Sequence, residues 1–204
     1  VHIEREIGEI RKIVVHDGHS GPQEIGVGPE FLAWLTDPKM NGGGASIDFG
    51  CYGANLITWL MKGERPLSVT AVFQQMKPDI YREVDDEATI LVTYPRTQGI
   101  IQASWNWPFS RKDLEIYGQT GYVNTLDSQR MRIRLAGEDA EKEIQAPRSE
   151  GAFDDPFTFF AAVVRGSHTV KPTDLSALEI NLTVVQILEA ARNSARQNKT
   201  IFLK

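Results

Sequence analysis

Short segments in which apolar and polar residues alternate follow one another through the middle of this chain, from about residue 67 to residue 146. Alternation with a period of two turns one set of side chains toward a core and the other toward water, as in a half-buried β-strand. Turns near Gly99, Gly118 and Gly137 separate several of these segments. Successive strands joined by tight turns predict a mostly antiparallel sheet. We expect its strands at residues 67–74, 88–94, 100–107, 113–117, 122–126, 131–135 and 141–146.

Two helices are predicted after these strands. Asp154-Asp155-Pro156 is typical of a helix start, with acids at the positive end and proline in the first turn, and Gly166 ends that helix. Thr173 or Asp174 is predicted to cap the next helix, which ends near Gln197. Apolar residues at helical spacing predict the buried positions of the two helices. These are Phe157, Phe160, Ala161 and Val164 on the first, and Leu178, Leu182, Val185, Leu188 and Ala191 on the second.

Four segments outside this region complete the predicted fold. Residues 7–16 read as a strand, residues 31–35 as a short helical segment, and residues 201–203 as a last short strand. Residues 45–61 have the spacing of a helix that ends near glycine and proline. The order of one strand, one helix, a meander and two helices predicts an α+β fold. We expect a mostly antiparallel open sheet with helices packed on one face, in a single domain spanning residues 1–204.

A glycine triplet, Gly42-Gly43-Gly44, leads into the predicted helix that carries Asp48 and Tyr52. Residues four positions apart lie on one face of a helix, and Asn55 and Trp59 extend that face. Glycine permits a tight turn and the close approach of another group. An acid and a phenol on one helical face can handle a substrate hydroxyl. The alternative is that Asp48 only offsets the helix dipole and that Tyr52 only packs.

The spacing of Gly42-Gly43-Gly44, Asp48, Gly50 and Tyr52 resembles a motif of the Gfo/Idh/MocA oxidoreductases. In that family, which includes glucose–fructose oxidoreductase and inositol dehydrogenase, the motif opens a helix at the start of the C-terminal, substrate-binding domain. Many members have histidine where Tyr52 stands, and tyrosine resembles the glucose–fructose oxidoreductase branch. The resemblance implies the same α+β fold over nearly the whole chain, with the free face of the sheet building a homodimer or homotetramer.

Two other marks of that family are missing from the sequence. A Gly-x-Gly-x-x-Gly fingerprint, which marks a dinucleotide-binding Rossmann domain, does not occur, and neither does the Glu-Lys-Pro segment that supplies a catalytic lysine. We therefore expect this chain to be the C-terminal domain alone, as a fragment or as a natural stand-alone module. NAD or NADP would be bound mainly by the missing N-terminal Rossmann domain, and the chain alone is expected to be inactive.

The resemblance also implies roles for Tyr52 and Asp48. Tyr52 would hold or exchange the proton of a sugar or polyol hydroxyl while hydride leaves the same carbon, and Asp48 would orient the substrate or tune the acid–base group. Asn55 and Trp105 are the expected substrate-binding residues, although Trp105 and Trp107 also suit a subunit contact or a core. A free phenol titrates near ~10, so base chemistry at neutral pH needs a nearby positive charge. We expect that charge to come from the missing domain.

Composition excludes several other classes of function. The net charge of −5 argues against a general nucleic-acid surface, and no apolar run approaches the length of a membrane span. The N-terminal residues lack a signal-peptide layout and Cys51 is the only cysteine, which favours a cytoplasmic protein. The histidines lack zinc spacing, so no metal is expected. Arg130, Arg132 and Arg134 predict a solvated strand face, with an anion site as the alternative.

Three functions from different classes remain at this stage. The leading one is the substrate-binding and oligomerisation domain of an NAD(P)-dependent oxidoreductase that acts on a CH–OH group of a sugar, inositol or related polyol. The second is a non-enzymatic module that binds a sugar or only assembles subunits. The third is part of an NAD-dependent glycosidase, in which transient oxidation serves to cleave a glycosidic bond.

Overall fold

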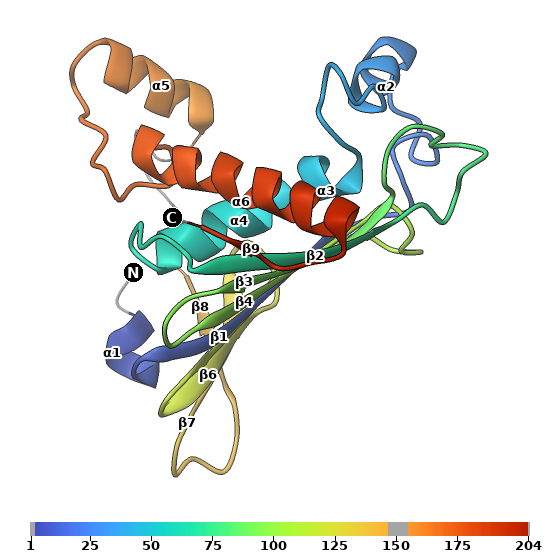
Figure 1. The fold of residues 1–204 in the computed structure, drawn as a ribbon. Helices are drawn as coiled ribbons and strands as arrows, with labels where there is room; N and C mark the ends of the chain where they lie inside the picture. Colours follow the sequence, from blue (N-terminus) through green and yellow to red (C-terminus); the bar gives the residue numbers. More distant parts are fainter. Residues whose placement is uncertain (1–2, 147–154, 204) are drawn as a thin grey trace.

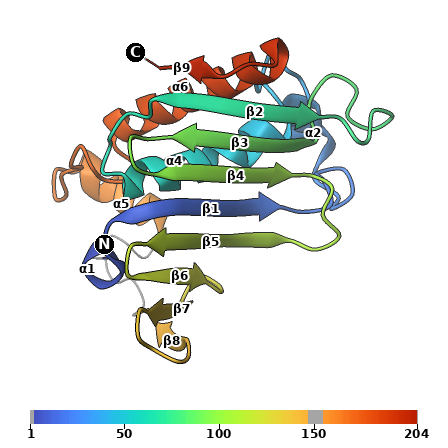
Figure 2. The same ribbon diagram turned by 60° about the horizontal axis from the view of Figure 1, so that its bottom comes forward.

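The computed structural model describes residues 3–146 and 155–203, and its centre is a sheet of nine strands (Figures 1 and 2). Their spatial order is β8-β7-β6-β5-β1-β4-β3-β2-β9, and all neighbours are antiparallel except β1 and β4. This confirms the predicted α+β fold with a mostly antiparallel open sheet. The strands are β1 (Ile10–Gly18), β2 (Ser68–Gln74), β3 (Glu87–Thr93), β4 (Gln98–Ser104), β5 (Arg111–Gly118), β6 (Gly121–Thr125), β7 (Arg130–Leu135), β8 (Lys142–Gln145) and β9 (Ile201–Phe202).

Two helices cover one face of the sheet and close the main core. They are α4 (Gly50–Leu60) and α6 (Leu178–Gln197), which lie together on one side in Figure 1. Glycine lets α4 approach closely, because a Cβ at Gly53 would lie 2.5 Å from the Ile101 side chain of β4. We call the side of the sheet that carries α4 and α6 the helix-side face and the opposite side the open face; in Figure 2 no described helix crosses the open face of β1–β5.

The first strand enters the middle of the sheet, which local sequence pattern did not predict. β1 is flanked by β4 on one side and β5 on the other, and it begins at Ile10 rather than at residue 7. Residues Ile3–Ile7 form α1 instead, and Gly8, with φ of +73°, makes the turn between them. The predicted short helix is present as α2 (Pro29–Leu35). No local pattern specifies a strand's neighbours, because pairing is decided by contacts distant in sequence.

The motif helix is divided in two, contrary to the single helix predicted at residues 45–61. α3 spans Ala45–Asp48, Phe49 follows it, and α4 begins at Gly50. Phe49 is buried in a second, smaller core with Leu35, Ala45, Tyr81 and Trp105. The break therefore coincides with a buried aromatic side chain that joins the helix pair to this core.

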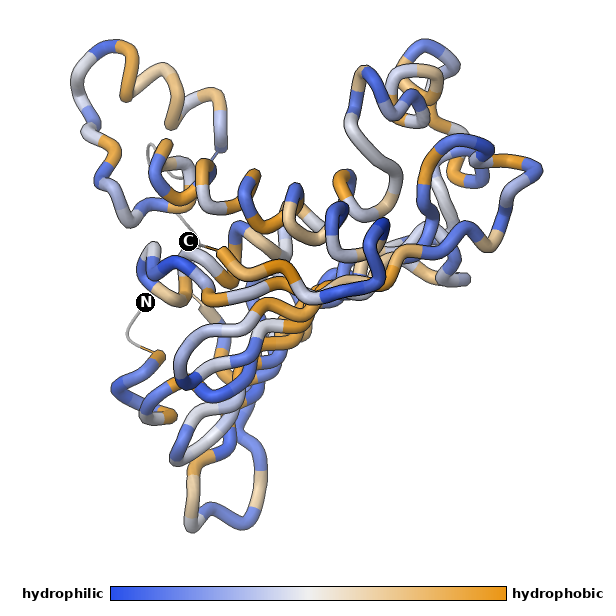
Figure 3. The backbone as a smooth tube through the Cα atoms, viewed as in Figure 1, coloured by the Kyte–Doolittle hydropathy of each residue, from blue (hydrophilic) through white to orange (hydrophobic). Residues whose placement is uncertain are grey.

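The predicted core positions of the last two helices are only partly correct: Ala191 of α6 is buried and Leu188 packs against the core, but most of the others are exposed. Phe157, Phe160 and Val164 of α5 (Pro156–Val164) are exposed, and α5 is coloured mostly hydrophobic in Figure 3 although it stands apart from the sheet. On α6 the predicted positions Leu178, Leu182 and Val185 are exposed. The buried positions of α6 are Ile180, Thr183, Val184, Ile187, Ala190, Ala191 and Ser194.

Both helix starts also differ in detail from expectation. Asp155 caps α5 by accepting hydrogen bonds from the backbone of Phe157 and Thr158, whereas Asp154 lies outside the described residues. α6 begins at Leu178 rather than after Thr173 or Asp174, because Asp174 accepts the Lys171 backbone N–H within a preceding turn. In the described part of the chain, no helix combines the length and the apolar character that crossing a membrane requires.

Candidate functional site

The glycine triplet is fixed in place by Asp85, which lies between β2 and β3. The Asp85 carboxylate accepts hydrogen bonds from Gly44 N (3.2 Å), Ser46 N (2.7 Å) and Ser46 Oγ (2.9 Å). Its backbone oxygen accepts Ala45 N at 3.0 Å. A Cβ on Gly44 would lie 1.8 Å from that same oxygen, so only glycine fits there. These contacts set the position and direction of α3, which carries Asp48.

Asp48 is held in place by a hydrogen bond from Trp105. The indole Nε1 donates a hydrogen bond of 3.0 Å to Asp48 Oδ2, and Trp105 itself is fully buried. Burial raises the pKa of Asp48, while the Trp105 hydrogen bond and the nearby His19 and Lys112 oppose that rise. The Asp48 carboxylate is therefore oriented by one buried donor and surrounded by further polar groups.

His19 follows β1 and packs edge-on against Phe49, with ring centres 4.9 Å apart. Its Nδ1 accepts the Gly21 backbone N–H at 2.9 Å, so the neutral ring carries its proton on Nε2. Burial lowers the pKa of His19, and the carboxylates of Asp48 and Glu24 oppose that effect. At neutral pH His19 is a neutral donor beside an acid.

Tyr52 lies in the first turn of α4, with 49% of its surface exposed. The Nζ atom of Lys112 lies 4.2 Å from the centre of its ring and 3.2 Å from Oδ2 of Asp17. Burial raises the pKa of Asp17 to about 6; the Lys112 ammonium opposes that rise, and Asp48 adds to it. Asp17, His19, Asp48, Tyr52 and Lys112 thus form one polar cluster, which we call the Tyr52 cluster.

Two of the four predicted site residues, Asp48 and Tyr52, belong to this cluster. Asn55 donates its amide to the Leu175 backbone oxygen at 3.0 Å, which ties α4 to the segment before α6. Trp105 is past the end of β4, and the contact it makes in the site is with Asp48. The roles of all four residues toward a substrate stay predictions.

Sequence reasoning missed Asp17, His19 and Lys112 as members of the site. A signal was present, because the polar run His16-Asp17-Gly18-His19 directly follows the apolar residues of the first strand. No such signal pointed to Lys112, since an isolated lysine at the start of a strand is typical of a solvated surface. Cys51 is half-buried, and burial raises the pKa of its thiol to about 11, so it is protonated at neutral pH.

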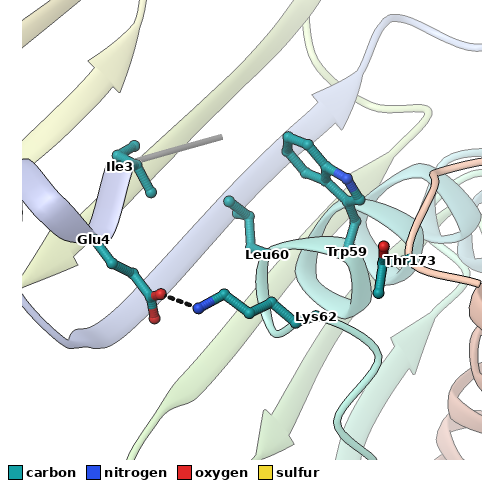
Figure 4. Close-up of a pocket in the computed structure, with 6 residues that line it drawn as sticks. All are labelled: Ile3, Glu4, Trp59, Leu60, Lys62 and Thr173. Atoms are coloured by element: carbon teal, nitrogen blue, oxygen red, sulfur yellow. Dashed lines mark hydrogen bonds and ion pairs between the residues drawn. The ribbon is translucent and has the colours of Figure 1, made fainter. Parts of the chain in front are cut away.

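A pocket of about 170 Å³ lies at the other end of α4 (Figure 4). The Glu4 carboxylate and the Lys62 ammonium form an ion pair at its edge, beside the apolar side chains of Ile3, Trp59 and Leu60. Tyr52 and Leu60 are eight positions apart on α4, roughly 12 Å along the helix axis, so this pocket is separate from the Tyr52 cluster. Trp59, predicted to extend the Asp48 face, lines this pocket instead.

One group of described side chains has the spacing of a metal site. His16, Asp113 and Glu115 offer atoms within 4.8 Å of one another, on the open face. His16 Nδ1 lies 3.0 Å from Asp113 Oδ1, and Arg111 pairs with both carboxylates, 3.0 Å from Asp113 Oδ1 and 3.6 Å from Glu115 Oε1. Because Arg111 already pairs with both of these acids, the group is explained as an ion-pair network.

The exposed arginine face of β7 is also paired. Arg130 contacts Asp127 at 2.7 Å and Glu143 at 3.4 Å, and Arg132 lies 3.8 Å from Glu141. This matches the prediction of a solvated strand face, since exposed pairs of this kind are typical of a surface in water.

Comparison with known proteins agrees with this fold. Residues 3–124, more than half of the chain, match the model of the GFO/IDH/MocA C-terminal domain. No curated protein matches the chain.

Solved structures of oxidoreductases share the fold over almost all of the chain. An NAD-binding oxidoreductase from Klebsiella pneumoniae has a TM-score of 0.79 at 18% identity, with 100% of this chain and 61% of that chain covered. An inositol dehydrogenase homolog from Azotobacter vinelandii, complexed with NAD+, has a TM-score of 0.77 at 17% identity, with 99% of this chain and 60% of that chain covered. The aldose–aldose oxidoreductase from Caulobacter crescentus, complexed with glycerol, has a TM-score of 0.73 at 22% identity, with 97% of this chain and 56% of that chain covered.

The chain thus spans less than two thirds of the length of these proteins. The matching domain model, the nine-stranded sheet and the glycine motif that opens α3 agree with one another. The chain belongs to the GFO/IDH/MocA family and corresponds to its C-terminal domain.

Proposed function

We propose that this chain is the substrate-binding domain of an NAD- or NADP-dependent oxidoreductase that acts on a CH–OH group of a sugar, inositol or related polyol. The observation that carries the proposal is the Tyr52 cluster, which places a carboxylate and a half-exposed phenol together at the motif of a GFO/IDH/MocA domain. The inositol dehydrogenase homolog and the aldose–aldose oxidoreductase, which share this fold, support this substrate class.

In this proposal Tyr52 exchanges the proton of the substrate hydroxyl, because its own hydroxyl is on a side chain that solvent and substrate can reach. Asp48 accepts a hydrogen bond from a second substrate hydroxyl, with Trp105 fixing the carboxylate. Asn55 contacts the substrate only by exchanging its present partners, the Leu175 oxygen and the Asn181 side chain. Trp105 contributes through Asp48.

The glycine-rich helix start in the described part of this chain is not open to a dinucleotide. Phosphate groups bind to backbone N–H groups at such a helix start, yet here Gly44 N and Ser46 N already bind the Asp85 carboxylate. We therefore propose that the cofactor is held by another part of the enzyme, an N-terminal Rossmann domain. The oxidoreductases that share this fold are long enough to contain one, since this chain covers only 56–61% of them.

We propose that the N-terminal Rossmann domain covers the outer side of α5 and α6. Apolar side chains are exposed on these two helices, which lie on the same side of the sheet as α4, the helix that carries Tyr52 (Figure 1). A domain that docks on these side chains would bring a cofactor toward the Tyr52 cluster. The side chains are Phe157, Phe160, Val164, Leu178, Leu182 and Val185.

We also propose that the open face of the sheet joins subunits into a homodimer or homotetramer. Val14, Ile100 and Leu91 are register partners across β1, β4 and β3, and all three are only partly buried. Val72 of β2 is exposed at the side of this patch. The mass in solution tests this proposal: a monomer at the concentration used in the activity assay would contradict it.

Oxidation of candidate sugars and polyols by the natural protein that contains this chain tests the proposed reaction. Each substrate is assayed with NAD and with NADP, and formation of the reduced cofactor is followed by its absorbance. We expect turnover with a neutral sugar or polyol and strongly lowered turnover in the Tyr52→Phe variant. Binding of the sugar without any cofactor reduction in the wild-type protein would favour the non-enzymatic module instead.

A further inference from the structure

Asp17 and Lys112 reach the Tyr52 cluster through strand register rather than through the motif. They are direct partners in the antiparallel ladder of β1 and β5. Cross-strand partners project from the same face of a sheet, and Asp17 shares its face with Ile13 and Val15, which belong to the core that α4 closes. The pair therefore projects toward the start of α4, where Tyr52 lies.

The two residues of this pair differ in how far their side chains are exposed to solvent. The Asp17 side chain is only 5% exposed, whereas that of Lys112 is 64% exposed. A lysine ammonium on a flexible four-carbon stem samples many positions unless a partner holds it. Asp17 Oδ2, at 3.2 Å from the Nζ atom, is a partner fixed in the core. The ammonium is thereby kept 4.2 Å from the Tyr52 ring centre, well within the range of a cation–π contact.

We propose that Asp17 and Lys112 are positioning residues for Tyr52. Asp17 holds the Lys112 ammonium against one face of the phenol ring, and the ammonium fixes the direction in which the phenol hydroxyl points. The occupied ring face is closed to substrate, which must approach from the hydroxyl edge or the opposite face. This inference rests on the proposed function, in which Tyr52 exchanges the substrate proton, and it places a cation beside that group within this chain.

The charges around the pair make its contact dependent on pH. Asp48 and Cys51 interact with Asp17, while Lys112 interacts with both Asp48 and His19. Protonation of Asp17 removes the negative charge that anchors the ammonium. The raised pKa of about 6 brings this loss into a range that can be measured without denaturing the protein.

Tyrosine NMR in the complete natural protein tests the positioning directly. The five tyrosines of this chain are labelled with 13C in the ring, and Tyr52→Phe identifies the Tyr52 signal. The variants are Lys112→Met, Lys112→Arg and Asp17→Asn, with Lys142→Met as the matched control, because Lys142 is an exposed lysine paired with Glu138 on a distant strand. We expect the first and third variants to move the Tyr52 ring signals, Lys112→Arg to restore them and Lys142→Met to leave them unchanged. We also expect an inflection of the wild-type signal near pH 6 that Asp17→Asn abolishes.

Kinetics provide the second measurement. Loss of correct orientation lowers kcat by roughly ten- to a hundredfold. We expect Lys112→Met and Asp17→Asn to lower kcat by this factor with little change in the KM for the sugar, and Lys112→Arg to recover most of it.

Two results would overturn the proposal: unmoved Tyr52 signals in a folded Lys112→Met protein, or an inflection that persists in Asp17→Asn and so belongs to His19 or Asp48. Failure of the proposed function gives a different result. In that case the wild-type protein reduces neither nicotinamide cofactor with any sugar, while the NMR signals still report whether Lys112 positions Tyr52.

Discussion

Two consecutive residues of β1, His16 and Asp17, face opposite sides of the same sheet and belong to different polar networks. His16 pairs across the strands with Asp113 on the open face, and Arg111 also pairs with Asp113. Asp17 pairs with Lys112 on the helix-side face, where burial raises the pKa of its carboxyl. Both His16 and Asp17 are buried, so the difference teaches that neighbouring buried polar residues join different networks according to the face from which their cross-strand partners project.

Removing the Tyr52 hydroxyl is expected to have the largest effect on function. Tyr52→Phe keeps the ring against Lys112 but removes the group that exchanges a proton, which contributes about 10²–10⁴ in rate. We expect kcat of the full enzyme to fall by that factor and the affinity for the cofactor to be unchanged. Tyr117→Phe, on the open face, is the control; an equal loss in that variant would show that the two faces do not differ in function.

The second largest effect is expected from loss of the Asp85 carboxylate, which holds the glycine triplet. Asp85→Ala leaves the N–H groups of Gly44 and Ser46 without their acceptor, at a cost of about 1–3 kcal/mol in the free energy of unfolding. Chemical denaturation measures this cost, and the exposed neighbour Glu83→Ala serves as control. A stability loss no larger than that of the control would show that Asp85 does not fix the start of α3.

A comparable effect, which distinguishes the two faces, is expected in the pH dependence of the free energy of unfolding. Because the pKa of Asp17 is raised to about 6 in the folded protein, the folded state binds more protons than the unfolded state between about pH 4 and pH 6. Stability from this group is present at low pH and is lost as the pH rises through that window. We expect Asp17→Asn to remove this decline, which is about 3 kcal/mol.

Denaturation of the two proteins at a series of pH values measures this difference. Lys112→Met is the control, since it retains the buried Asp17 carboxyl and therefore retains the decline. Parallel pH profiles for wild type and Asp17→Asn would contradict the assignment of a shifted group to the helix-side face.

The smallest effect is expected on the outer side of α6. Leu182→Ala removes an exposed side chain and should change the free energy of unfolding of this chain by less than about 0.5 kcal/mol. Ile187→Ala, one turn further along but buried against the sheet, should cost about 2–5 kcal/mol. Denaturation of this chain alone provides both values. A large loss for Leu182→Ala would show that this side of α6 is packed already.

The strands and the motif were predictable because their signals are local. Alternation located β2, β3 and β5–β8 nearly to the residue, and the spacing of Asp48 and Tyr52 placed them on consecutive turns of the motif helices. The core face of α5 was predicted wrongly and that of α6 only in part correctly, since Leu188 and Ala191 meet the core but Leu178, Leu182 and Val185 do not. α6 is apolar on more than one side, since both Leu182 and Ile187 fit a helical stripe, and local spacing does not say which stripe meets the sheet.

The amino-acid sequence by itself determined the α+β class, the meander, and an acid and a phenol beside a glycine turn, because hydrophobic period, turn residues and residue spacing act over a few positions. Only the tertiary structure decided that β1 lies between β4 and β5. That placement makes Asp17 the partner of Lys112 and brings the ammonium to Tyr52, a contact between residues 60 positions apart in the chain. The physical reason is that strand pairing and burial depend on the whole core, so the charge beside Tyr52 arises from register and from no local pattern.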